Sequence, residues 1–173
     1  TLNAGQYFDW TTTGTQGAPH YFRTDRNAFL YHVSGCSQDE EVGMSAMPEI
    51  SCTGSRYIEF SRFNQTGLLQ NMPVLIPPTA EPTLKLNGID YDAVPGVIIQ
   101  NVPGLTGWKT AYFPNGSVAA NNILTSEGFF HAGWLTGNNT TGAYGYLSGF
   151  DDAFEFQDPT ASIPIPTTIY HVA

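Results

Sequence analysis

Glycine and proline interrupt this chain so often that little room is left for a helix. The 173 residues include eighteen glycines and twelve prolines, and both residue types weaken or break helices. No stretch of eleven or more residues carries an apolar stripe at helical spacing that is free of Gly, Pro and β-branched clusters. Only the acid-rich segment 38–47 predicts a short helical turn, which Pro48 would end.

Short runs of aromatic and β-branched residues, which favour strands, recur between these breaks. In the run 55–63 the residues alternate, so that Tyr57, Glu59 and Ser61 share one face. Asn87-Gly88 separates two further runs and predicts a tight hairpin, because both residues tolerate positive φ. The expected strands are 20–24, 28–33, 55–63, 83–86, 89–94, 96–102, 108–113, 123–134, 143–150, 154–157 and 168–172.

Many short strands with turn signals between them predict an all-β fold. We expect 1–173 to form a single-domain antiparallel β-sandwich, with a β-barrel as the alternative. The segment 68–82 contains four prolines and is expected to cross between sheets. Early in 162–173, isoleucine alternates with proline, which denies ladder donors along one edge. That segment predicts a C-terminal edge strand, or an extended arm on a neighbouring subunit of a homo-oligomer.

Cations are scarce in this chain. Charged residues make up 12% of it, against about 25% in an ordinary soluble domain, and Lys85 and Lys109 are the only lysines. Such a chain stays soluble through hydroxyl and amide groups, a composition that indicates a secreted protein. The net charge of −9 repels phosphate backbones and anionic lipid, which argues against nucleic-acid and membrane-surface partners. No apolar run approaches the length that membrane insertion needs.

Cysteines and glycosylation sequons point to the same compartment. Cys36 and Cys52 have fifteen residues between them, and a disulfide closing that loop would stabilise the fold by about 3 kcal/mol; two separate buried thiols are the alternative. The first residue, Thr1, is expected to follow a removed signal peptide. Sequons for N-glycosylation lie in stretches that predict turns, at Asn64, Asn115, Asn138 and Asn139.

No motif in the sequence assigns a catalytic residue. Asp90 and Asp92 lie two apart on an expected strand and would share one face. Glycoside hydrolysis needs two carboxyl groups about 5–9 Å apart, so an acid-working glycoside hydrolase stays an alternative. Asp151 and Asp152, with Asp158, offer oxygen ligands for calcium, although their spacing matches no EF-hand loop. The histidines have no metal-ligand spacing, so no metal site is assigned and no other cofactor is expected.

Aromatic residues interleaved with glycine give the strongest indication of a ligand surface. The segments 128–134 and 142–150 combine rings with residues that let a flat ligand or another backbone approach closely. Trp134, Tyr144 and Tyr146, with Asp151 and Asp152 as hydrogen-bonding neighbours, are therefore the candidate ligand-binding residues. The alternative is that these rings are ordinary core residues of a β fold.

Three functions remain open at this point. The first is a secreted, N-glycosylated binding or surface protein without catalysis, which binds a glycan or an extracellular protein through exposed aromatic rings. The second is a self-assembling extracellular structural subunit that uses its C-terminal strand. The third is the acid-working glycoside hydrolase.

Overall fold

The computed structural model describes residues 3, 6–8, 18–24, 30–34, 43–47, 50, 53–62, 67–138 and 142–148. Within these ranges, ten strands and two short 3₁₀ turns build one two-stranded and one eight-stranded sheet, and every strand pair is antiparallel. The elements are β1 (Leu30–Ser34), β2 (Gly43–Met47), β3 (Ser55–Ser61), β4 (Leu69–Ile76), η1 (Glu81–Thr83), β5 (Lys85–Leu86), β6 (Ile89–Asp90), η2 (Tyr91–Ala93), β7 (Ile98–Asn101), β8 (Lys109–Phe113), β9 (Asn121–Gly137) and β10 (Gly142–Tyr146).

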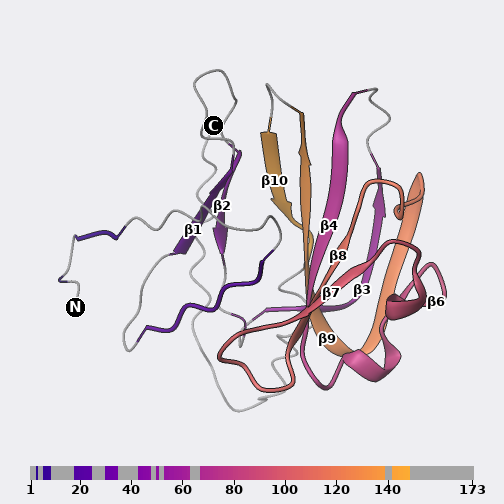
Figure 1. The fold of residues 1–173 in the computed structure, drawn as a ribbon, viewed down its shortest axis with the longest axis horizontal. Coiled ribbons are helices and arrows are strands. Elements are labelled where there is room, and N and C mark those ends of the chain that lie inside the picture. Colours follow the sequence, from indigo (N-terminus) through magenta and orange to yellow (C-terminus); the bar gives the residue numbers. More distant parts are fainter. Residues whose placement is uncertain are drawn as a thin grey trace, which may run out of the picture.

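Strand β9 is the spine of the larger sheet. Its seventeen residues pair with four strands: β3 and β10, and also β4 and β5. The strand order β6-β5-β9-β4-β8-β7, with β3 and β10 added on β9, curls into a half-barrel (Figure 1). The pair β1–β2 lies on the β10 side and β2 contacts β10. The predicted all-β antiparallel fold is confirmed.

The predicted Asn-Gly hairpin forms as expected. Asn87 and Gly88 have φ values of 53° and 80° and connect β5 to β6, as a type I′ turn requires. Lys85 and Asp90 face each other across the hairpin and form an ion pair at 2.9 Å. The return strand is shorter than predicted, because the chain turns into η2 directly after Asp90.

Two segments differ from their predicted structure. Residues 69–76, expected within a crossover, form the central strand β4, because alternate side chains from Gln70 to Ile76 are buried. Pro73 has no backbone N–H to donate to a neighbouring strand. It is tolerated in β4 because the pairing of β4 with β9 is interrupted at residues 72–73, whereas the pairing with β8 continues through Pro73. Residues 43–47, expected in a helical turn, form strand β2 instead. Residues 20–24, expected as a strand, are not in one.

Several other predictions fall outside the described residues. They concern Cys36, Cys52, the sequons at Asn64 and Asn139, the acids Asp151, Asp152 and Asp158, the expected strands 154–157 and 168–172, and the segment 162–173. These stay predictions, as does the single domain over 1–173.

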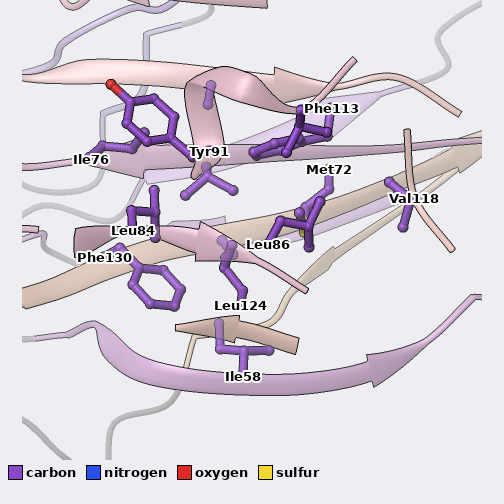
Figure 2. Packing of buried hydrophobic residues seen from close by; sticks show 14 of the residues in the cluster. Ile58, Met72, Ile76, Leu84, Leu86, Tyr91, Phe113, Val118, Leu124 and Phe130 are labelled. Atoms are coloured by element: carbon purple, nitrogen blue, oxygen red, sulfur yellow. The ribbon is translucent and has the colours of Figure 1, made fainter. Parts of the chain in front are cut away.

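The core fills the inside of the curled sheet. Alternate residues of β4, β8 and β9 meet there, η2 adds the ring of Tyr91, and the residue that follows η2 adds Val94. Figure 2 shows these side chains gathered between the strands, with Ile58 of β3 and Phe113 of β8 on opposite sides. The largest fully buried side chains of the described residues are apolar, apart from Asn122. The core therefore depends on the curl of the sheet, which brings β3 and β8 to opposite sides of one cluster.

A bulge in β9 makes that curl possible. Between the pairs Ser55↔Phe130 and Tyr57↔Thr125, β9 has four residues opposite one residue of β3. In this bulge a Cβ on Gly128 would lie 2.5 Å from the backbone of Thr79. The turn before η1 therefore presses directly on β9, in the close backbone approach that glycine permits.

Hydroxyl groups hold this contact together. Ser126 Oγ donates to the carbonyl of Ala80 at 2.9 Å, and the Glu127 amide donates to Thr83 Oγ1 at 2.9 Å. On the β3 side the Arg56 guanidinium lies 4.5 Å from the centre of the Phe129 ring, a cation–π contact. Contacts with the η1 turn on one side and with β3 on the other therefore fix the position of the bulge.

We predict that Gly128→Ala lowers the free energy of unfolding by about 1–3 kcal/mol, because the new methyl group overlaps the Thr79 backbone. Urea unfolding monitored by circular dichroism measures this loss. Gly116→Ala is the matched control, since a Cβ there meets no atom within 4 Å, and it should change stability by less than about 0.5 kcal/mol. Equal unfolding midpoints for the two variants would contradict the proposed close packing.

Candidate functional site

Tyr144, one of the predicted ligand residues, is half-buried against its own sheet. Its ring covers Gly133 on β9, where a Cβ would lie 2.9 Å from the Tyr144 hydroxyl. The hydroxyl contacts Met47 Sδ at 3.5 Å, and the ring of His32 meets the Tyr144 ring edge-on at 4.9 Å. The glycine beside this aromatic therefore makes room for a tyrosine ring of the same sheet and for the β1–β2 pair above it.

Tyr146 belongs to a buried polar cluster with His131 and Thr53. The Tyr146 hydroxyl lies 2.8 Å from His131 Nδ1 and 3.2 Å from Thr53 Oγ1. Nearby, Ser148 Oγ accepts from the amide of Ala132 at 2.6 Å and donates to the carbonyl of Phe130 at 3.3 Å. These hydrogen bonds connect the segment before β3 to β9 and β10, so the role of the cluster is structural.

Burial keeps the groups of this cluster neutral. Desolvation lowers the pKa of His131, although a hydrogen bond to the backbone of Ile50 partly opposes the shift. Desolvation also raises the pKa of Tyr146, against hydrogen bonds with Thr53 and Ser148 that lower it. A neutral imidazole that donates to a backbone carbonyl can accept from the Tyr146 hydroxyl at Nδ1. The hydrogen-bond pattern therefore fits an uncharged cluster.

Trp134 lies in the core. Its side chain is 6% exposed and its ring meets Phe60 at 5.2 Å, edge to face. The indole Nε1 is buried, and no hydrogen-bond partner for it lies among the described residues. The expectation that Trp134, Tyr144 and Tyr146 form one exposed platform is therefore wrong for Trp134, because β9 turns this side chain to the inside of the half-barrel. Asp151 and Asp152 lie outside the described residues, so their contribution stays a prediction.

The predicted carboxylate pair does not form on one strand face. Asp90 ends β6 and pairs with Lys85, whereas Asp92 lies in η2. In the described ranges, no group of three or more His, Cys, Asp or Glu side chains is placed to hold a metal ion. A third carboxylate, Glu81, has a structural role, as Asp90 does. It forms an ion pair with Lys109 and accepts a hydrogen bond from the Tyr91 hydroxyl at 3.3 Å.

An exposed sheet face, centred on Tyr57, carries the features of a binding surface. The pairings Tyr57↔Thr125, Thr125↔Lys85 and Lys85↔Asp90 align one row of side chains across β3, β9, β5 and β6. Tyr57 is 53% exposed. We name this surface the Tyr57 face; its members are Tyr57, Glu59, Ser61, Lys85, Asp90, Asn121, Ile123 and Thr125.

Hydrogen bonds preorganise the side chains of the Tyr57 face. The Tyr57 hydroxyl donates to Glu59 Oε2 at 3.0 Å, and this bond raises the pKa of Tyr57. Ser61 Oγ donates to Asn121 Oδ1 at 2.9 Å. An open ring with carboxylate, hydroxyl, amide and ammonium groups around it can stack on a flat ligand and hydrogen-bond its rim.

Sequence reasoning missed this face as a candidate surface, although the sequence held the signal. The alternation in 55–63 correctly placed Tyr57, Glu59 and Ser61 together, and all three are exposed. Aromatic rings beside glycine were the weaker indicator of a binding surface, because the space next to the glycine is filled by a ring of the protein itself, as Tyr144 fills the space over Gly133. An exposed aromatic on the polar side of an alternating strand was the better one.

The two described sequon asparagines differ in their surroundings. Asn138 is exposed at the end of β9. Asn115 is half-buried. Its side-chain Oδ1 accepts a hydrogen bond from the backbone amide of Gln70, and its backbone amide donates to Asn71 Oδ1, both at 3.1 Å. Asn138 is therefore the more accessible attachment point.

Comparison of the chain with protein-family models, with curated proteins and with solved structures found no match. Within the described residues there is no helix of the length and apolar character that crossing a bilayer requires.

We predict that the stability of this protein falls as the pH drops below about 6.5, the ordinary pKa of histidine in an unfolded chain. The folded state holds His131 neutral, so the unfolded state binds more protons below that pH. Above it, this contribution to stability is constant. Urea unfolding between pH 5 and pH 8 measures the slope, and His131→Gln should flatten it. The same pH dependence in both proteins would contradict the assignment.

Proposed function

We propose that this chain is a secreted, N-glycosylated protein without catalytic activity that binds a glycan on the Tyr57 face. The observation that carries the proposal is the open Tyr57 ring in a row of polar side chains on an exposed sheet face. Sugars present alternating apolar and hydroxyl-bearing surfaces, and a ring with donors and acceptors around it complements both.

The physical form of this face favours binding over hydrolysis. Glu59 and Asp90, the two carboxylates of the Tyr57 face, lie on β3 and β6 with β9 and β5 between them. Three strand spacings separate their backbones by about 14 Å. Glycoside hydrolysis requires carboxyl groups about 5–9.5 Å apart, so we do not favour the hydrolase.

Composition supports the extracellular part of the proposal. Three features of the sequence are typical of secreted proteins. They are the scarcity of lysine, the pair Cys36 and Cys52, and the sequons at Asn64, Asn115, Asn138 and Asn139. An acidic surface also suits a neutral glycan or another extracellular protein better than a polyanion. We propose no cofactor, with calcium at Asp151 and Asp152 as the alternative.

We predict that Tyr57→Ala weakens glycan binding by about fivefold, because loss of a stacked ring costs about 1 kcal/mol. A glycan array identifies the ligand, and calorimetry with that glycan measures the change. Tyr31→Ala is the matched control, since Tyr31 is 58% exposed on β1, away from the Tyr57 face.

Two results would overturn the proposal. Absence of binding to every glycan of the array would remove the sugar-binding function. Equal losses of affinity in the Tyr57 and Tyr31 variants would place the ligand elsewhere or show that binding is non-specific.

We further predict that protein secreted from a eukaryotic host carries a glycan at Asn138. Peptide mass spectrometry before and after treatment with peptide N-glycosidase locates the modified residue. Asn138→Gln should lose more of the attached mass than Asn115→Gln, because Asn138 is exposed whereas Asn115 is half-buried. Unmodified Asn138 in secreted protein would contradict this expectation.

A further inference from the structure

Strand β7 forms an open end of the larger sheet. It pairs with β8 through Ile98↔Tyr112 to Asn101↔Lys109, and in the described part of the chain no other strand pairs with it. Its outer edge therefore presents backbone donors and acceptors that another strand can bind.

The apolar inner face of the sheet extends to this edge, where it becomes exposed to solvent. One row of paired residues crosses β9, β4, β8 and β7, through Ala132, Val74, Ala111 and Ile99. The first three side chains are at most 1% exposed, whereas Ile99 is 37% exposed. On the other face of β7, Ile98 is 51% exposed. A strand added beside β7 would cover both isoleucines and continue the core row.

Natural edge strands are commonly protected by charge or by proline, and β7 has neither within its four residues. The flanking sequence is nearly uncharged: between Asp92 and Glu127, the only charged residue is Lys109. Lys109 is itself paired with Glu81. This segment thus carries no acid in a chain whose net charge is −9.

That charge distribution selects the partner. Two copies of an acidic chain repel each other over most of their surfaces and can approach closely where acids are lacking. A basic partner would instead be drawn to the acid-bearing regions. We propose that β7 is the contact between two copies of this chain, paired antiparallel about a two-fold axis, which continues the sheet from one copy into the other.

Geometry restricts the register of this pairing. Residues directly opposite each other in an antiparallel pair share a face, so Ile99, on the inner face, must oppose an inner-face residue of the other copy. A two-fold axis at Ile99 places Ile99 against Ile99 and Ile98 against Gln100. Each inner isoleucine then covers the other, which is the β-branched cross-strand pair that sheets favour.

The expected association is weak, because four residues of edge pairing bury less surface than a stable dimer needs. Sedimentation velocity on the full chain should show a monomer–dimer equilibrium with a dissociation constant on the order of 100 μM. Ile99→Lys should weaken it by at least about tenfold. Ile123→Lys is the matched control, since Ile123 is 40% exposed on the Tyr57 face, and it should leave association unchanged. Circular dichroism verifies that both variants fold.

Cysteine crosslinking tests the register separately. In the Ile99→Cys variant, the opposed Cα atoms of the two copies would lie about 5 Å apart, within disulfide range. In the Ile98→Cys variant, the two substituted positions would be offset along the strands and about 8 Å apart, beyond that range. Peptide mapping should find a disulfide between copies of the Ile99→Cys variant and none between copies of the Ile98→Cys variant.

The competing occupant of this edge is the C-terminal segment 162–173, and deleting it separates the two cases. If β7 pairs with β7, the truncated chain dimerises as before. Loss of dimer on truncation, a strictly monomeric full chain, or unchanged association of Ile99→Lys would each overturn the proposal. Tyr57→Ala should not change the oligomeric state, so this test is independent of glycan binding.

Discussion

The close contact between Gly128 and the turn at Thr79–Ala80 is the constraint on which the rest of the fold depends. Strand β9 is too long to stay flat while pairing with four strands, and the bulge before Phe130 lets it bend. The bend allows the sheet to curl, and the curl encloses the core cluster. A side chain at residue 128 would push the turn away and open the inside of the half-barrel.

Several of the described cations make specific contacts within the fold. Lys85 closes the β5–β6 hairpin through Asp90, and Lys109 binds Glu81. Arg62 donates to the carbonyls of Asn115 and Val118, which holds the loop before β9. Exposed ion pairs contribute little free energy individually, so their role here is to select one arrangement of short strands. This use leaves the surface acidic or uncharged, which suits the partners that we propose.

The candidate site was only partly predictable, for a physical reason. Periodicity reports which residues share a face, and it correctly grouped Tyr57 with Glu59 and Ser61. It cannot report which face another element covers. Tyr144 and Tyr146 looked like an open platform until the structure placed Met47, His32 and Thr53 against them. Trp134 lies inside because of the direction in which β9 curls, a property of the whole sheet.

Local chemistry in the sequence determined the all-β class, the hairpin at Asn87-Gly88 and the alternation of β3, since each depends on neighbouring residues and their allowed dihedral angles. Tertiary structure decided the remaining features. Pro73 sits in a central strand because its missing donor falls where the β4–β9 ladder is interrupted. The exposure of Tyr57, the burial of Trp134 and the open edge at β7 all follow from strand order and curl. Those properties arise from contacts between residues far apart in the chain, which local patterns do not encode.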